Sequence, residues 1–175
     1  MIKNSKEYLN FKHECDSQIS NYPLDLKWKK LSDEWLRKAF MQRYMYNFEC
    51  LGRPVIQTPN DMIAIQEIIW KIKPDLIIET GVAHGGSVIM SASMLAMLDM
   101  CEAIDNNQKL NPKISNRKVL AIDIDIRKHN REAIENHSMS SRIQMIEGSS
   151  ISSEIIAQVK EKAKKYKNIL IFLDS

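Results

Sequence analysis

Four short apolar runs in the second half of the chain constrain its fold more than any other feature. They are 76–78, 119–122, 143–146 and 169–173. Each is continuous rather than strictly alternating, which is typical of strands buried on both faces of a parallel sheet. Helical stretches lie between them, from Ser87 to about Ala103, from Arg127 to about His137 and from Ser152 to about Tyr166. Strand–helix–strand alternation predicts right-handed βαβ units and therefore an α/β, doubly wound layer fold.

The residues before the first run predict helices. Ser32-Asp33-Glu34 precedes apolar residues spaced three to four apart, which indicates an N-capped amphipathic helix that Gly52-Arg53-Pro54 stops. Thr58 as N-cap and Pro59 at the first helical position predict a second helix, which Lys73-Pro74 ends. We therefore expect an N-terminal helical cap over residues 1–58 and an α/β domain over residues 59–175.

Two further segments bear on the architecture. The polar, Asn-rich stretch from Asp105 to Arg117 contains Pro112 and predicts a loop, unusually long for a connection between a helix and a strand. The chain stops at Leu173-Asp174-Ser175, where a buried strand would meet its loop. Four strands are roughly half of a doubly wound sheet, and so apolar a final strand would be an exposed sheet edge. We therefore expect the chain to be part of a longer protein.

Composition narrows the class of protein. The chain has 175 residues, of which 44% are hydrophobic and 27% charged, as in a soluble globular domain. The net charge of +3 is too balanced to indicate nucleic acid binding, and the Lys-rich segment 160–167 is interpreted as a solvated helix face. Cys15, Cys50 and Cys101 form no CxxC motif, which indicates reduced thiols. Without an apolar run of about 20 residues or a signal peptide, we expect a cytoplasmic protein with no transmembrane segment.

The strongest candidate site is the segment from Glu79 to Ser87 (Glu-Thr-Gly-Val-Ala-His-Gly-Gly-Ser), which holds three of the five glycines. It lies between the first strand and a helix, where backbone N–H groups and the helix dipole favour an anion. Its spacing differs from the G-x-G-x-x-G of dinucleotide sites. It suits an amino-acid moiety, with Glu79 near an ammonium group and Gly85 to Ser87 near a carboxylate. The alternative is a tight turn that needs glycine for packing.

Polar residues also follow the other strands. Asp123 ends the second run and could accept both hydroxyls of a ribose, as could Asp125; the alternative is a solvated carboxylate or a helix cap. Ser149 and Ser150 follow the third run and could reach a purine edge, or belong to a helix N-cap cluster. Asp174 ends the fourth run and could hold a hard cation together with partner carboxylates.

The segment 74–87, Pro-Asp-Leu-Ile-Ile-Glu-Thr-Gly-x-x-His-Gly-Gly-Ser, resembles the cephalosporin hydroxylase / rhamnosyl O-methyltransferase family. So do Gly52-Arg53-Pro54, 66–70, 123–127, 147–150 and 173–175. The resemblance runs from about Tyr46 to the last residue. Members of this family are S-adenosylmethionine-dependent methyltransferases, distantly similar to catechol O-methyltransferases.

The resemblance implies a partial Rossmann-like, class I methyltransferase fold with strand order 3-2-1-4. It implies that S-adenosylmethionine is bound by Glu79, Gly81, His84, Gly85, Gly86, Ser87, Asp123, Ser149 and Ser150. Within this set the ribose falls at Asp123 and the adenine near Ser149 and Ser150. Asp174 matches the first acidic ligand of the family's magnesium site and is the candidate catalytic residue, while the other ligands follow a later strand.

The function expected from these features is methyl transfer to a hydroxyl of a sugar, glycolipid or other small molecule, with magnesium assistance. Arg53 and the aromatic residues Tyr44, Tyr46 and Phe48 either line the acceptor pocket or pack between helices. Two alternatives remain open: a non-catalytic cofactor-binding chain or partner subunit, and a nicotinamide-dependent oxidoreductase. A homo-oligomer also remains open. His129 and His137 form no iron site with a carboxylate and are interpreted as surface residues.

Overall fold

The computed structural model describes residues 5–174, which form two compact units, one ending at Tyr44 and one beginning at Met45. The sequence analysis placed the boundary between the helical cap and the α/β domain at residue 58. In the structure the second unit already begins at Met45, so the segment 45–58 belongs with the second unit. Residues 1–4 and Ser175, the last residue of the 173–175 motif, lie outside the described residues.

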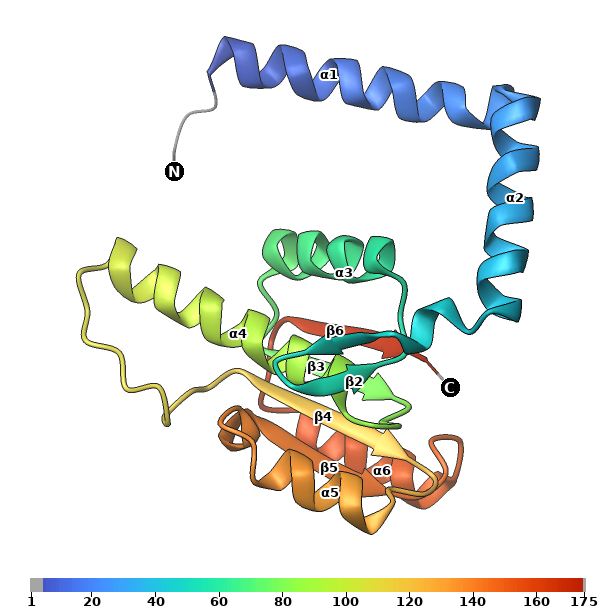
Figure 1. The fold of residues 1–175 in the computed structure, drawn as a ribbon. Coiled ribbons are helices and arrows are strands. Elements are labelled where there is room, and N and C mark those ends of the chain that lie inside the picture. The colour runs from blue at the N-terminus through green and yellow to red at the C-terminus, as the bar shows by residue number, and fades with distance from the viewer. Residues whose placement is uncertain (1–4, 175) are drawn as a thin grey trace. The chain divides into compact units, whose positions relative to one another are not determined.

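The first unit consists of helices. They are α1 (Lys6–Asn21), the 3-10 turn η1 (Tyr22–Leu24) and α2 (Leu26–Met41), drawn in blue in Figure 1. Helix α2 begins after Asp25, whose carboxylate accepts hydrogen bonds from the N–H groups of Lys27 and Trp28. The predicted start at Ser32 is therefore wrong, because the cap lies seven residues earlier and Ser32 falls inside the helix. The helix also ends before Phe48, at Met41.

A β-hairpin opens the second unit and was not predicted. After the turn η2 (Tyr44–Tyr46), strands β1 (Phe48–Cys50) and β2 (Arg53–Val55) pair antiparallel. The two residues between the strands, Leu51 and Gly52, have φ of +48° and +82°. Positive φ at both positions is typical of the tight turns that match strand twist in two-residue hairpins. The segment Gly52-Arg53-Pro54 is thus part of a hairpin rather than a helix stop.

The α/β part follows the predicted alternation (Figure 1). Its elements are α3 (Pro59–Ile72), β3 (Leu76–Thr80), α4 (Gly86–Asp105), β4 (Lys118–Asp123), α5 (Lys128–Glu135), η3 (Ser140–Arg142), β5 (Ile143–Glu147), α6 (Ser153–Ala163) and β6 (Ile169–Leu173). Thr58 caps α3 as predicted, accepting a hydrogen bond from the N–H of Asp61. The four strands are parallel in the order β5-β4-β3-β6. This is the predicted order 3-2-1-4, and the α/β prediction is confirmed.

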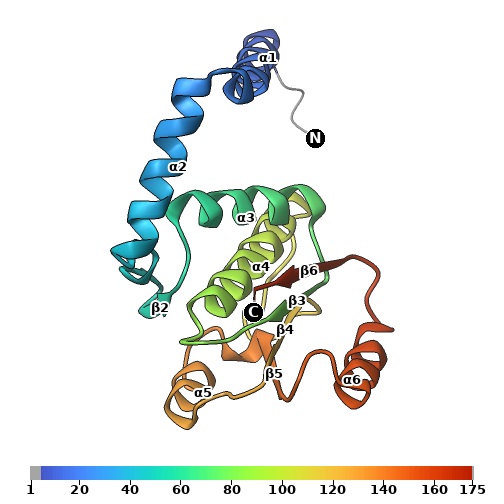
Figure 2. The ribbon, with the colours of Figure 1, turned by 90° about the vertical axis from the view of Figure 1, so that its right-hand side faces the viewer.

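Two apolar layers hold the sheet. On one face, helices α3, α4 and α5 contribute Ile69, Leu95 and Ile134 to a core with Ile77 and Val119 of the sheet. On the other face, Ile155 of α6 packs with the alternate side chains of the strands. Figure 2 shows α4 and α5 on one side of the sheet and α6 on the other. The reversal of side between successive crossovers places a crevice at the carboxyl ends of β3 and β6.

Burial of the strands differs from the prediction at the sheet's edges. Strand β3 is buried throughout and β4 nearly so, but β5 is mostly half-buried and β6 alternates between exposed and half-buried residues. In β6, Leu170 and Phe172 pack on the first core, whereas Leu173 is 81% exposed. The prediction of strands buried on both faces is right for the two central strands and wrong for the two outer ones, because α6 alone covers the second face.

Helix α4 is, among residues 5–174, the one helix that is long and apolar enough to span a membrane by length and composition. Much of it is packed against the sheet, as in the core helix of an α/β domain.

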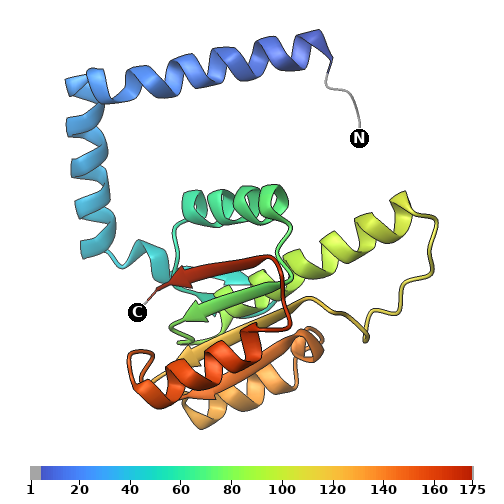
Figure 3. The same ribbon diagram turned by 180° about the vertical axis from the view of Figure 1, so that it is seen from behind.

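A buried ionic network, which the sequence analysis missed, anchors the loop after α4. Asp99 of α4 accepts hydrogen bonds at 2.5 Å from the guanidinium groups of Arg117 and of the buried Arg142, and another from Ser115. Burial raises the pKa of Asp99, but the hydrogen bonds outweigh it and hold that pKa below its ordinary value. Residues 106–117 form the predicted loop, visible in Figure 3 between α4 and β4, and this network ties its far end to the domain.

Candidate functional site

Two adjoining cavities lie where the carboxyl ends of β3 and β6 meet the start of α4. The inner cavity has a volume of about 170 Å³ and the outer one about 320 Å³. Val55, Ser87 and Asp174 line both, so the two cavities lie side by side and together form a hollow at this edge of the sheet. Ligands of doubly wound sheets bind at this edge, where the strand order reverses. The cavities are therefore the candidate site.

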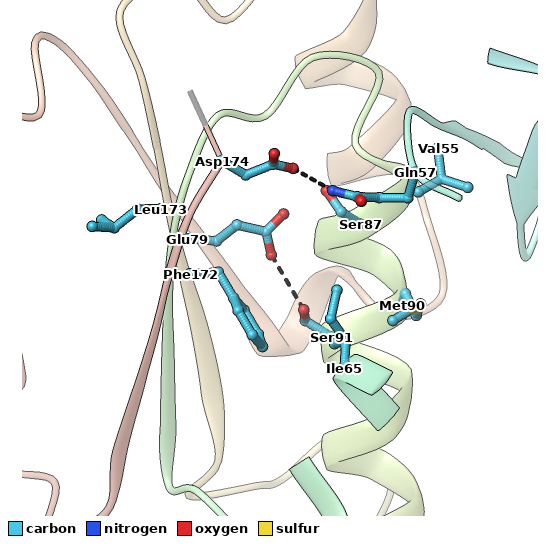
Figure 4. A pocket seen from close by; sticks show the side chains of 10 residues that line it. All are labelled: Val55, Gln57, Ile65, Glu79, Ser87, Met90, Ser91, Phe172, Leu173 and Asp174. Carbon is cyan, nitrogen blue, oxygen red and sulfur yellow. Dashed lines mark hydrogen bonds between the residues drawn. The ribbon is translucent and has the colours of Figure 1, made fainter. Parts of the chain in front are cut away.

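The inner cavity contains a buried carboxylate (Figure 4). Glu79, at the penultimate position of β3, is only 2% exposed. Its Oε2 accepts a hydrogen bond from the Ser91 hydroxyl at 3.2 Å, whereas its Oε1 has no hydrogen-bond partner among the described residues. Burial and, to a smaller extent, the negative charge of Asp174 raise the pKa of Glu79 to about 7, against the opposing effect of the hydroxyls of Ser87 and Ser91.

This arrangement suits a cationic group. A buried acceptor without a donor is costly, and an ammonium group in the cavity would supply the missing hydrogen bond together with a countercharge. Ser87 and Ser91 are four residues apart and therefore project from the same face of α4 toward Glu79. Ser91 was not identified from the sequence, although this spacing from Ser87 was available as a signal.

The outer cavity is lined by the turn between β3 and α4. Gly81 and Gly85 have φ of +91° and +85°, and Ala83 has φ of +45°, which is uncommon for a residue with a side chain. Asp123, at the end of β4, holds this turn: its Oδ2 accepts hydrogen bonds from the N–H groups of Val82 at 2.7 Å and Ala83 at 3.3 Å. Gly81, His84, Gly86, Ser87 and Asp123, which the sequence analysis named as candidate cofactor-binding residues, line this cavity.

Asp123 has a structural role besides its place in the cavity wall. Although burial raises the pKa of Asp123, hydrogen bonds from backbone N–H groups, the one from Val82 foremost, hold that pKa below its ordinary value. Asp125 is exposed and its N–H donates to Asp123 Oδ1 at 3.2 Å. Each carboxylate oxygen has two lone pairs; Oδ2 already accepts two hydrogen bonds and Oδ1 one, so Asp123 retains capacity for one further donor at Oδ1.

The two glycines that end the turn are needed for packing. A Cβ on Gly86 would lie 2.2 Å from the carbonyl oxygen of Pro54, and one on Gly85 would lie 2.5 Å from the side chain of Ile134. Hairpin β1–β2 thus packs closely against the turn at Gly86, and helix α5 packs closely against it at Gly85. For Gly85 and Gly86, the packing interpretation therefore holds whether or not they also face a ligand.

Several predicted residues lie elsewhere. Arg53 does not line either cavity but donates to the carbonyl oxygen of His84, and Tyr46 and Phe48 are also absent from both linings. Tyr44 packs edge-on against Trp35. Of the two alternatives for these four residues, lining an acceptor pocket or packing, neither cavity supports the first, and the contact of Tyr44 with Trp35 agrees with the second for Tyr44.

Ser149 and Ser150 also lie outside both cavities. Ser149 instead accepts a hydrogen bond through its carbonyl oxygen from the N–H of Ser152, which caps α6. This agrees with the alternative interpretation of the serines as an N-cap cluster. His137 is half-buried and is held by Leu51 and Met139.

Asp174 is the candidate metal ligand. Its Oδ2 accepts a hydrogen bond of 2.6 Å from Gln57 Nε2 (Figure 4). The N–H of Asp174 donates to the carbonyl oxygen of Thr80. Within residues 5–174, no three His, Cys, Asp or Glu side chains gather into a group that could hold a metal ion. The described residues therefore do not fit a magnesium site by themselves, because Mg²⁺ in such sites is held by more than one protein or substrate oxygen.

A glycine-rich turn after the first strand of a 3-2-1-4 parallel sheet, with acids ending the first and second strands, defines a Rossmann-like ligand-binding domain. Residues 42–175 match the sequence profile of the family described as rhamnosyl O-methyltransferase/CmcI. The match spans most of the chain, and the chain belongs to this family. The resemblance proposed from the sequence motifs is thereby confirmed.

Solved structures similar to the chain include two of CmcI, one named with SAH and one with Mg-SAM. Both are 15% identical and align over 74% of this chain, with 54% and 47% of their own chains and TM-scores of 0.47 and 0.49. An O-methyltransferase from Bacillus cereus in complex with SAH is 16% identical over 90% of this chain and 59% of its own, with a TM-score of 0.42. This chain thus spans about half the length of those proteins. No curated protein sequence matches it.

Proposed function

We propose that the chain binds S-adenosylmethionine as the methyl donor for an O-methyl transfer. The observation that carries the proposal is the buried Glu79, whose Oε1 lacks a donor and faces a cavity beside the glycine-rich turn. Family membership supports it independently. When bound, this cofactor supplies a methyl group on a positively charged sulfur.

The proposed roles follow from the positions of the residues. Glu79 would pair with the ammonium group of the donor's amino-acid part, and the first N–H groups of α4, at Gly86 and Ser87, would face its carboxylate. Asp123, which lines the outer cavity, would accept a ribose hydroxyl through its remaining lone pair on Oδ1. The assignment of adenine to Ser149 and Ser150 stays a prediction.

The acceptor in this proposal is a hydroxyl of a sugar, glycolipid or other small molecule, in the cytoplasm. The residues that line the hollow would align that hydroxyl with the donor's methyl group, since in-line geometry is the main contribution that a methyltransferase can make. Because the described residues do not form a metal site, no step of the proposal uses magnesium.

Calorimetric titration with S-adenosylhomocysteine (SAH) and, separately, NAD tests the proposal. We expect saturable binding of SAH and none of NAD, and we expect Glu79→Gln to weaken SAH binding. Saturable NAD binding without SAH binding would overturn the proposal in favour of an oxidoreductase. A labelled-donor assay against a panel of glycans then separates an active enzyme from a chain that binds the cofactor without turnover.

A further inference from the structure

The carbonyl groups of the glycine-rich turn are held by side chains from outside the predicted site. Arg53, on strand β2, donates two hydrogen bonds to the carbonyl oxygen of His84, from Nε at 2.9 Å and Nη2 at 2.6 Å. Asn130, on α5, donates from Nδ2 to the carbonyl oxygen of Ala83 at 2.8 Å. Arg53 Nη2 also donates to Asn130 Oδ1 at 3.1 Å, which joins the two side chains. We call this pair the turn clamp.

The clamp acts on a backbone that needs support. Ala83, whose carbonyl it binds, has a left-handed φ of +45°, a conformation that persists in non-glycine residues only when the surroundings impose it. The N–H groups of the same turn are bound by Asp123. Asp123 at the end of β4 therefore holds the N–H groups of the turn, and the clamp holds its carbonyl groups.

The same hairpin that carries Arg53 also touches the turn through its backbone. Pro54 and Val55 lie so close to Gly86 that a Cβ there would come within 2.2 to 2.7 Å of their atoms. Val55 also lines both cavities. Each hydrogen bond of Arg53 ends on a neutral oxygen, His84 O or Asn130 Oδ1, and Asn130 is buried. A charged guanidinium used in this way orients backbone rather than neutralising an acid.

We propose that Arg53 is a positioning residue, which with Asn130 holds the glycine-rich turn in the conformation that accepts the methyl donor. This inference rests on the proposed function, since it assigns the donor to the turn. Arg53 makes no contact with the donor in this scheme; it acts through the His84 carbonyl. Hairpin β1–β2 is thereby coupled to donor affinity.

The test compares Arg53→Ala and Arg53→Lys with Arg37→Ala, measuring SAH affinity by calorimetry and amide hydrogen exchange across residues 81–86. Arg37 is a control for the loss of an arginine because it is exposed on α2, in the first unit, whereas the turn belongs to the second unit. From the loss of two to three hydrogen bonds, we expect about tenfold weaker SAH binding in Arg53→Ala, with faster exchange in the turn. Arg53→Lys keeps the charge but lacks the fork, so we expect most of the loss to remain.

Chemical rescue separates positioning from a general loss of stability. Guanidinium ion, added well below denaturing concentrations, should restore SAH binding and slow exchange in Arg53→Ala, while sodium chloride at equal ionic strength should not. Unchanged SAH affinity in Arg53→Ala, or weaker affinity with unchanged exchange in the turn, would overturn the inference. A wild-type protein that fails to bind SAH would overturn the proposed function as well, whereas normal wild-type binding with a normal Arg53→Ala overturns the inference alone.

Discussion

Replacing Glu79 with glutamine should stabilise the ligand-free protein while weakening donor binding. The pKa of Glu79 rises from 4.5 to about 7 because the carboxyl group is buried. Between these values the folded protein holds a proton that the unfolded chain has lost, so the free energy of unfolding falls as the pH rises from about 4.5 to 7. At 1.36 kcal/mol per pKa unit, the total loss is ~3 kcal/mol. Glutamine stays neutral at every pH, so Glu79→Gln does not undergo this loss of stability.

Urea unfolding at a series of pH values between 5 and 8 measures this effect. We expect Glu79→Gln to be more stable than the wild type above pH 7, by up to ~3 kcal/mol, and the difference to vanish toward pH 4.5. Glu67→Gln is a suitable control, because Glu67 is exposed on α3 and the same chemical change there should leave the pH dependence unaltered. Parallel pH curves for the wild type and Glu79→Gln would refute the buried-carboxylate reasoning.

Ligand binding supplies the second half of the prediction. If the donor's ammonium group pairs with the ionised carboxylate, SAH affinity in the wild type should increase as the pH rises from 5 to 7, and binding near pH 6 should release a proton. Titrations in buffers of different ionisation enthalpy measure that proton. In Glu79→Gln the release should disappear and affinity should fall roughly 10- to 100-fold, as for a lost hydrogen bond between charged groups. Proton release that persists in the variant would assign it to another group.

Three further substitutions test other contacts within the second unit. Asp123→Ala leaves the N–H groups of Val82 and Ala83 without their acceptor. We therefore expect a loss of ~1–3 kcal/mol of stability together with weaker SAH binding. Unchanged SAH affinity would mean that the ribose is held elsewhere. Asp99→Ala leaves buried Arg142 without a carboxylate and should lower the free energy of urea unfolding by ~3–5 kcal/mol at neutral pH. Because the pKa of Asp99 is lowered in the folded protein, this difference in stability between wild type and variant should shrink as the pH falls through that pKa. Gly86→Ala should destabilise much more than Gly52→Ala, since a Cβ on Gly86 meets the backbone of Pro54 while one on Gly52 meets open space; equal losses in thermal unfolding would contradict this.

The sheet could be predicted from the sequence because its signals are local. Continuous apolar runs, a Thr-Pro helix start and a glycine cluster after a strand each depend on a few neighbouring residues. The order of the strands was implied by the family resemblance alone. Helix α2 shows the limit of such signals: Asp25 and Ser32 are both good N-cap residues, and only the structure shows that Asp25 binds the two N–H groups. The hairpin escaped prediction because Leu51-Gly52 lacks the usual Asn-Gly or Asp-Gly turn sequence.

Contacts between distant residues set the rest of the site. Arg53 is 31 positions from His84 and 77 from Asn130, and Gln57 is 117 from Asp174. No local pattern links them, so the sequence analysis left Arg53 between an acceptor pocket and packing, and it gave Gln57 no role. The burial of Glu79 could be inferred from its position at the end of an apolar run, but its missing hydrogen bond could not.

The contacts around the turn separate the residues that stabilise the fold from those left free for a ligand. Asp123 binds its N–H groups and the turn clamp binds its carbonyl groups, so the backbone is fixed before any ligand arrives. That leaves the first N–H groups of α4 and Glu79 Oε1 for the ligand, and the buried carboxylate is the one group in the set that costs stability in the free protein. Removing Glu79 should therefore stabilise the fold and impair binding, whereas removing Asp123 should impair both. If Glu79→Gln is more stable and Asp123→Ala less stable than the wild type, while both bind SAH more weakly, then Glu79 is a residue retained for binding rather than for folding.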